Sequence, residues 1–400
     1  MNGRVSRLEK IIQMISILKR YSEIKMENND ISQSLDNLTE DFVVNIGPQH
    51  PSTHGVLRLQ VKLDGETIKD VIPHLGYIHR GIEKMTESLG YKQFIYLTSR
   101  MDYLSAHINN QACALAIEKG LQVEVPARAK AIRIIMAELQ RLTSHELWWG
   151  SCAMDMGAVT PFFLAFRDRE RILEIFEANT GNRLTFNYIT PGGVMFDVLP
   201  SFVSSIKDLL KKVKNYLKEY DNLITGNLIF QHRLKGVGYL PRELAISLGC
   251  SGPVARASGI SCDVRKYYPY DGYENLRFKE ILNTGCDSWA RYEVRMEEMK
   301  QSIYIIEQLI DNLPEGEFRS KMKGVIKLPE GEYYQRVEAA RGEFGVYIVS
   351  DGGNKPYRVK FRSPSFSNLA ALKPITVGSK IGDLMASMAT IDLVIPDIDR

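Results

Sequence analysis

Alternating hydrophobic and polar residues predict a small sheet near the start of the chain. Residues 42–46 and 56–63 alternate with the period of two that a half-buried strand shows. Asp64 and Gly65 provide a tight hairpin turn before a third such stretch over residues 66–72. The same alternation returns near the other end of the chain. There, residues 344–349 and 357–361 flank a turn that begins at Asp351, so a second hairpin is expected.

Between these strands the spacing of apolar residues becomes helical. Pro126 stands where a first-turn proline belongs, and an apolar stripe follows it to about Gly150. Further long helices are predicted over about 160–180, 200–224 and 288–312, which indicates an antiparallel bundle. The members of the stripe are Ile132, Ile135, Met136, Leu139 and Leu142.

These patterns predict an α+β fold with a core of long helices and small β elements at its two ends. No repeat of fixed period is present, which argues against a solenoid. The expected divisions are an N-terminal extension of helix plus linker (1–40), an N-terminal β element with a histidine loop (41–78), the helical bundle (79–325), and a C-terminal β hairpin with a helical tail (326–400).

Composition narrows the class of protein. The chain carries 51 Lys and Arg against 48 Asp and Glu, a formal charge of +3, with 44% hydrophobic and 25% charged residues. Such a composition excludes collagenous and disordered proteins and supplies no general field for nucleic acid. No apolar run of roughly 20 residues, the length that crosses a bilayer, is present, so any membrane association should be peripheral.

The first forty residues read as an appendage. An amphipathic segment over residues 4–18 is followed by a polar, unpatterned stretch. A transit peptide is the alternative, but such segments are poor in acids and this one contains four of them, Glu9, Glu23, Glu27 and Asp30.

The cysteines predict neither a disulfide framework nor a metal site. Their number is odd, and no two of them form a CxxC pair. We therefore expect the chain to hold no metal of its own. The five are Cys113, Cys152, Cys250, Cys262 and Cys286.

Residues 47–55, which read GPQHPSTHG, form the densest cluster of unusual residues. Two prolines and two glycines stiffen this loop, so His50 and His54 are held on a constrained turn. An ordinary polar hairpin loop is the alternative. Zinc hydrolase chemistry is weakly supported because no HExxH motif is present, and serine-hydrolase, Walker and dinucleotide motifs are missing too.

Two further segments, residues 77–84 and 98–107, mix fixed cations with apolar residues. Arg80 and Arg100 are suited to balancing an anionic cofactor, because guanidinium stays charged and offers several donors. The alternative is that they pair with Glu83 and Asp102 or simply face water.

Tyr103 and Asp155 are the remaining candidates. The Tyr103 hydroxyl can donate a hydrogen bond or a proton from an apolar wall, although a core tyrosine is the default reading. Asp155 lies among small and apolar residues just past a predicted helix end. A buried carboxylate normally has a cationic partner, and a histidine would serve.

Taken together, these segments resemble one family. Residues 47–55, 79–84, 100–103 and 155–161 occur in this order in the D subunit of the proton-pumping NADH:quinone oxidoreductases, respiratory complex I. The resemblance runs from about Asp41 to the C-terminus and leaves residues 1–40 outside. Matching segments downstream are residues 191–194, 340–347, 350–353, 355–358 and 397–400.

The resemblance extends to the large subunit of [NiFe] hydrogenases, and it implies their type of helical core. Those enzymes hold their metal between two CxxC pairs, and both pairs are missing here. The cavity that held metal is therefore expected to be a quinone pocket, for menaquinone or ubiquinone.

Particular roles follow from the resemblance. His54 and Tyr103 match the pair that hydrogen-bonds the quinone headgroup, with His50 in the same loop, and Asp155 matches the carboxylate that partners the histidine. Arg80 and Arg100 match arginines near the terminal 4Fe-4S cluster, which the resemblance places on the B subunit.

Partners and location also follow from the resemblance. It implies assembly with the B, C and I subunits and the membrane-embedded H subunit, and no activity of the isolated chain. The expected location is the cytoplasmic side of a bacterial inner membrane, peripherally bound. The matrix side of a mitochondrial inner membrane is the alternative.

One departure from the family concerns charge. Family members commonly carry a histidine and an arginine where this chain has Thr185 and Thr190. Fewer cations should lower the reduction potential of the cluster and weaken its pH dependence, which would suit a low-potential quinone such as menaquinone.

Two other readings remain at this point. A non-catalytic scaffold would tolerate conservative changes at Tyr103 without loss of quinone reduction. A hydrogenase-type enzyme would show nickel in the purified complex.

Overall fold

The computed structural model describes residues 42–50 and 55–400. The predicted N-terminal sheet is confirmed: β1 (Phe42–Ile46), β4 (Arg58–Asp64) and β5 (Thr67–His74) pair antiparallel in the order β1-β4-β5. Leu59, Val61 and Leu63 alternate inward and are buried, as the period of two predicts. A second pair, β2 (Gln49–His50) and β3 (Gly55–Val56), forms the base of the histidine loop.

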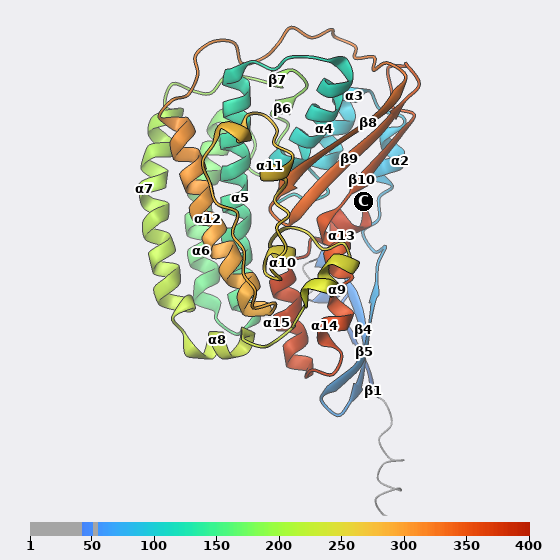
Figure 1. Cartoon of the computed structure of the whole chain (residues 1–400), viewed down its shortest axis with the longest axis vertical. Coiled ribbons are helices and arrows are strands. Elements are labelled where there is room, and N and C mark those ends of the chain that lie inside the picture. Colours follow the sequence, from blue (N-terminus) through green and yellow to red (C-terminus); the bar gives the residue numbers. More distant parts are fainter. Residues whose placement is uncertain (1–41, 51–54) are drawn as a thin grey trace, which may run out of the picture.

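Four long helices form the core, as predicted. They are α5 (Ala127–Asp155), α6 (Val159–Thr180), α7 (Phe202–Tyr220) and α12 (Ser288–Ile310), which run side by side in Figure 1. Two boundaries differ from the prediction. Pro126 precedes the first helical turn as its cap, and α5 continues past Gly150 to Asp155.

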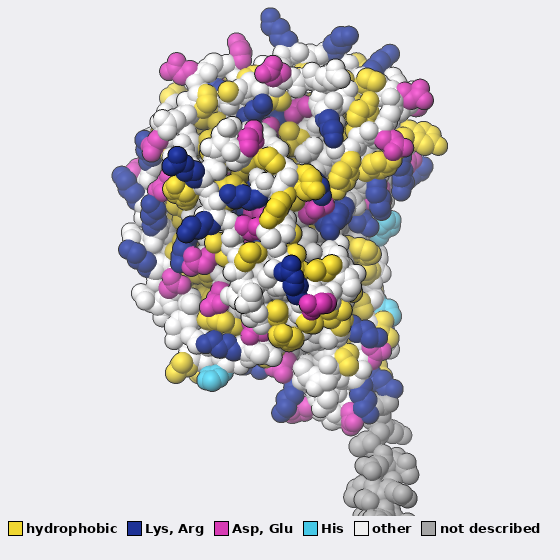
Figure 2. All heavy atoms as spheres, viewed as in Figure 1, with side chains coloured by type: hydrophobic (Ala, Val, Ile, Leu, Met, Phe, Trp, Pro, Cys, Tyr) yellow, Lys and Arg dark blue, Asp and Glu magenta, His cyan; other side chains and the backbone are white. Residues whose placement is uncertain are grey.

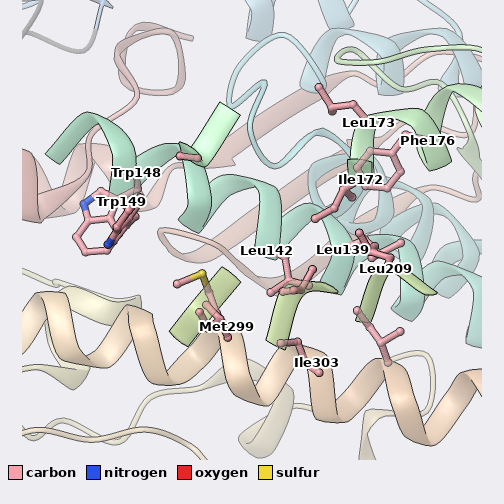
Figure 3. Packing of buried hydrophobic residues seen from close by; sticks show 14 of the residues in the cluster. Leu139, Leu142, Trp148, Trp149, Ile172, Leu173, Phe176, Leu209, Met299 and Ile303 are labelled. Atoms are coloured by element: carbon pink, nitrogen blue, oxygen red, sulfur yellow. The ribbon is translucent and has the colours of Figure 1, made fainter. Parts of the chain in front are cut away.

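The bundle is held together by apolar side chains from all four helices. Figure 3 shows buried side chains of this one cluster from all four helices: Leu139, Leu142, Trp148 and Trp149 of α5, Ile172, Leu173 and Phe176 of α6, Leu209 of α7, and Met299 and Ile303 of α12. All of these side chains are buried, and burial of large apolar side chains is the main favourable term in folding. The turn between α5 and α6 therefore joins two helices that share one core.

Before α5, three helices are present that were not predicted: α2 (Ile82–Thr86), α3 (Tyr91–Thr98) and α4 (Ala106–Leu121). In α4 nearly every residue is buried, including Asn109, Asn110 and Gln111. A helix covered on all sides has no polar face, so a search for an amphipathic stripe does not detect it.

The predicted C-terminal hairpin has a third strand. The sheet contains β8 (Gly331–Ala339), β9 (Gly342–Ser350) and β10 (Arg358–Arg362) in the order β10-β9-β8. The prediction of two strands was thus incomplete, because burial does not alternate strictly along β8. The turn from β8 to β9 consists of Ala340 and Arg341.

Short elements complete the fold. The last residues pack back onto it: α15 contacts α5 and α12, and α16 contacts β3 (Figure 1). The short elements are β6 (Ile189–Thr190), β7 (Gly193–Val194), α8 (Leu228–Leu234), α9 (Arg242–Ser247), α10 (Gly252–Arg256), α11 (Val264–Tyr267), α13 (Pro364–Leu369), α14 (Leu372–Thr376), α15 (Ile381–Ile391) and α16 (Ile395–Asp399).

The surface carries charges of both signs. In the view of Figure 2, Lys and Arg side chains are interspersed with Asp and Glu over most of the visible face. In the part of the chain that the structure describes, no helix is both long and apolar enough to cross a bilayer. The predicted α+β class with a helical core is confirmed.

Candidate functional site

A cavity of about 280 Å³ lies where the end of α5, the start of α6, the β8–β9 turn and the segment after α15 meet. Most of its wall is apolar, and its polar side chains come from distant parts of the sequence. The apolar side chains are Leu104, Leu147, Trp148, Met154, Phe162, Leu393 and Val394, and the polar ones are Tyr103, Ser151, Asp155, Arg341 and Asp392. An apolar wall with a few convergent polar groups is typical of small-molecule sites.

Tyr103 and Asp155, which sequence analysis singled out separately, both line this cavity. Gly55, the residue that follows His54 in the sequence, lines it too. His54 itself and the side chain of His50 lie outside the described residues. The structure therefore unites two of the predicted residues.

The Tyr103 hydroxyl remains available to a ligand. It has no hydrogen-bond partner among the described residues, although the residue is half-buried. Burial raises the pKa of Tyr103 above its ordinary value, although the positive charge of Arg341 acts in the opposite direction. The group is thus a neutral hydrogen-bond donor at physiological pH.

Asp155 is the last residue of α5, and not a residue past the helix end as predicted. The carboxyl end of a helix carries partial negative charge, so a carboxylate there is unfavourable without a positive or donating partner. This location favours a cationic group nearby when Asp155 is ionised.

Arg341 and Asp392 belong to the cavity wall but were not predicted. Arg341 Nη1 lies 3.2 Å from Asp102 Oδ2, and its Nη2 donates to Asp392 Oδ1 at 3.0 Å. All three side chains are almost wholly buried. The sequence offered one signal, the segment 340–347 that resembles the family, but it assigned no role to the arginine.

Arg80 and Arg100 lie away from the cavity, exposed and close to each other. Arg80 Nη2 donates to the carbonyl of Arg100 at 2.6 Å, and Arg100 Nη1 donates to the carbonyl of Tyr96 at 2.6 Å. Neither arginine pairs with Glu83 or Asp102, but both are exposed, as the alternative that they face water expects. Glu83 pairs with Lys360 at 3.0 Å, and Asp102 pairs with Arg341.

Thr185 and Thr190 occupy different environments. Thr185 is half-buried, whereas Thr190 is buried in β6 and its carbonyl accepts a hydrogen bond from Arg133 Nη2 at 2.8 Å. A guanidinium therefore does lie beside this segment, but it is paired with Glu118 and Asp271.

The sulfur and acid side chains form no ligand cluster in the described part of the chain. All five cysteines are free, and none lines the cavity. Among residues 42–50 and 55–400, no group of three or more His, Cys, Asp or Glu side chains is arranged to hold a metal ion.

Fold and cavity together define a large α+β protein with a helical core and a small-molecule cavity walled by a buried arginine, a tyrosine and aspartates. Comparison with known proteins specifies the class. The family described as "Respiratory-chain NADH dehydrogenase, 49 Kd subunit" matches residues 155–326 and 317–400.

Individual relatives agree with this family. A protein of Phocaeicola vulgatus, named as the C/D subunit of NADH-quinone oxidoreductase, is 53% identical over 382 residues, covering 95% of this chain and 74% of that protein. The D subunits of Desulforamulus reducens and Geobacter sulfurreducens are 46% and 44% identical, each covering 90% of this chain and 99% of the relative. The chain belongs to the D-subunit family of NADH-quinone oxidoreductase, respiratory complex I, and is thus part of an oxidoreductase complex.

Proposed function

We propose that the cavity holds the headgroup of a quinone, which is reduced there to quinol. In this proposal the electrons come one at a time from a terminal 4Fe-4S cluster held by the B subunit, which adjoins this chain. The observation that carries the proposal is that Tyr103 and Asp155 share one cavity with the buried cation Arg341. The names of the relatives, which are D subunits of NADH-quinone oxidoreductase, agree with quinone as the substrate.

The chemistry of the cavity suits this reaction. Adding electrons to a quinone places negative charge on its carbonyl oxygens, and a neutral donor such as Tyr103 can hydrogen-bond and then protonate an oxygen. His54, the residue before Gly55 of the cavity wall, would share this task when protonated. Asp155 would favour that protonated form by its negative charge. The apolar wall would hold the ring.

The exposed pair Arg80 and Arg100 would face the cluster on the B subunit. Positive charge there favours the reduced cluster. We propose further contacts with the C and I subunits and with the membrane-embedded H subunit, so that the chain is bound peripherally at the cytoplasmic face of a bacterial inner membrane.

The threonines predict a property of that cluster. Neutral Thr185 and Thr190 in place of a histidine and an arginine should give a low reduction potential with weak pH dependence, suited to menaquinone. A redox titration of the cluster in the assembled complex tests this. A high potential that falls steeply with pH would contradict it.

Replacement of Tyr103 by phenylalanine in the assembled complex tests the proposed site. NADH oxidation is measured with quinone and with an artificial acceptor that draws electrons upstream. We expect quinone reduction to fall by about 100-fold, since a donor to a developing oxyanion is lost, while the artificial reaction persists. The matched control is Tyr91→Phe, because the Tyr91 hydroxyl is buried against Ser350 Oγ at 2.9 Å and lies outside the cavity.

The control variant should reduce quinone at the normal rate. If Tyr103→Phe does so as well, Tyr103 only packs, and a scaffold without a quinone site becomes the better description.

A further inference from the structure

Arg341 lies in the β8–β9 turn, which is fixed on both sides. Its carbonyl accepts a hydrogen bond from Asn368 Nδ2 at 3.2 Å. The next residue, Gly342, has a φ of 134°, and a Cβ there would lie 2.5 Å from Ser251 Oγ. Only glycine fits this turn, so the backbone of Arg341 cannot shift without disturbing the packing of Ser251.

Three side chains hold the guanidinium of Arg341 at the cavity wall. Nη1 contacts Asp102 and also donates to Ser144 Oγ at 3.0 Å, and Nη2 donates to Asp392 at 3.0 Å. Burial lowers the pKa of Arg341, but the two carboxylates raise it by more, so the net pKa lies above its ordinary value. The wall of the cavity thus carries a permanent positive charge.

The guanidinium keeps unused hydrogen-bonding capacity. Arginine offers five N–H donors. Nη1 uses its two on Asp102 and Ser144, whereas Nη2 donates to Asp392 alone. Nε is buried and has no partner among the described residues. A buried donor without a partner costs free energy. Because Nε is closed off from solvent, we take the second N–H of Nη2 as the donor available to a ligand in the cavity.

We propose that Arg341 stabilises the negative charge that develops on the quinone headgroup during reduction, with Asp102 and Asp392 holding it in position. This inference rests on the proposed quinone site and adds a residue to it. Asp102 also directly precedes Tyr103 in the chain. One loop therefore positions both the Tyr103 hydroxyl and the carboxylate that binds the Arg341 guanidinium.

Electrons and protons balance without any proton transfer by Arg341. Two electrons, supplied by NADH through the cluster of the B subunit, and two protons convert the quinone into quinol. The electrons place negative charge on the carbonyl oxygens, and Arg341 donates hydrogen bonds to that charge while keeping its own protons. The protons come from Tyr103 and His54, as proposed above, and are replaced from water.

The competing explanation is that Arg341 is only a structural ion pair. Arg133 provides the comparison, because it is also buried between two carboxylates, at 2.5 Å from Glu118 and 3.4 Å from Asp271, but does not line the cavity. A structural role predicts similar effects of equivalent substitutions at both positions. A role in charge stabilisation predicts that only Arg341 affects turnover.

The test uses membranes that carry the assembled complex with Arg341→Met, Arg341→Lys or Arg133→Lys. The concentration of quinone is varied, and rates are normalised to the artificial-acceptor rate, which reports the amount of complex. Loss of a donor to a developing oxyanion should lower kcat by about 100-fold in Arg341→Met with little change in KM. Arg341→Lys keeps the charge but not the planar donors, so its kcat should recover to about a tenth of normal.

The outcomes separate the two explanations. Normal kcat in Arg341→Lys, or a higher KM at unchanged kcat, would overturn the inference, as would an equal loss of kcat in Arg133→Lys. If Arg341→Met does not assemble, Arg341→Lys decides by the same criteria. Normal turnover of both Arg341 variants together with collapse in Tyr103→Phe would reject this inference alone, whereas normal turnover in all of them would also reject the quinone site.

Discussion

Two arginines, Arg133 and Arg341, are each buried between two carboxylates, yet their surroundings differ. Every N–H of Arg133 is used, because Glu118 and Asp271 accept from it together with the carbonyls of Thr190 and Gly193. Arg341 leaves donors unused and lines a cavity. An arginine whose N–H groups all have partners in the protein has a structural role. One that keeps free N–H groups at a cavity wall can donate hydrogen bonds to a ligand.

Substitution of Arg133 should have the largest effect on stability. Arg133→Met would leave Glu118 and Asp271 buried without their cation, and breaking a buried pair on one side costs about 3–5 kcal/mol. We expect a loss of that order in the free energy of unfolding, measured by urea denaturation of the chain. Any Arg133→Met complex that assembles should still reduce quinone at the normal kcat, and a selective loss of kcat would break the comparison.

Substitution of Asp397, a buried carboxyl group near Asp102, should have the opposite effect and raise the free energy of unfolding at neutral pH. Burial and the nearby charge of Asp102 raise the pKa of Asp397 to about 6, although Ser363 donates a hydrogen bond to it. A carboxyl group with a raised pKa favours the folded state most at low pH, and this contribution is lost as pH rises from about 4 to about 6.

Asp397→Asn removes this ionisation and keeps an acceptor for Ser363. Because the pKa is higher in the folded state, ionisation of Asp397 lowers the free energy of unfolding of the wild type by about 3 kcal/mol at pH 7.5. The variant should recover part of this loss. The measurement is urea denaturation at pH 5 and pH 7.5. About half of the cost is already present at pH 5, so the advantage of the variant should be clearly larger at pH 7.5. An equal effect at both values would show that Asp397 is not ionised in this way.

A buried histidine in the core should make a smaller contribution, which depends on acid pH. His107 is fully buried, its ring stacks on Phe186 with centroids 4.0 Å apart, and burial lowers its pKa to about 3. A histidine held neutral stabilises the fold above its unfolded pKa of about 6.5, and this stability is lost as pH falls toward 3. Linkage gives a loss of about 2 kcal/mol between pH 7 and pH 5.

His107→Leu should therefore reduce the drop in the free energy of unfolding between pH 7 and pH 5 by about 2 kcal/mol. The exposed His232 offers a matched control, and His232→Leu should leave the drop unchanged. An unaltered pH dependence in the His107 variant would mean that other groups cause the acid sensitivity.

Sequence patterns predicted the parts of the fold that have one polar face. The helix α7 and the N-terminal strands alternate between core and solvent, so their periodicity is visible. The helix α5 was predicted from Pro126 and its apolar stripe, although most of it is buried. The helix α4 is buried all round and β8 is irregular, so neither shows such a pattern. Burial on every side depends on tertiary packing, which local periodicity does not contain.

The site was predictable only in part. Resemblance to a family pointed to Tyr103 and Asp155, and the cavity contains both. Arg341 was missed because its partners Asp102 and Asp392 lie 239 and 51 residues away in the sequence. Distant ion pairs of this kind emerge only when the turn after β8 is placed against the loop before α4.

The most direct test of the quinone site is labelling with a photoreactive quinone in the assembled complex, followed by peptide mapping. The account predicts cross-links in the cavity wall, at residues 103–104, 147–162 and 392–394, which excess natural quinone abolishes. Labelling of this chain only at residues outside the wall, such as the exposed Lys321 and Lys323, or labelling that natural quinone does not suppress, would contradict it.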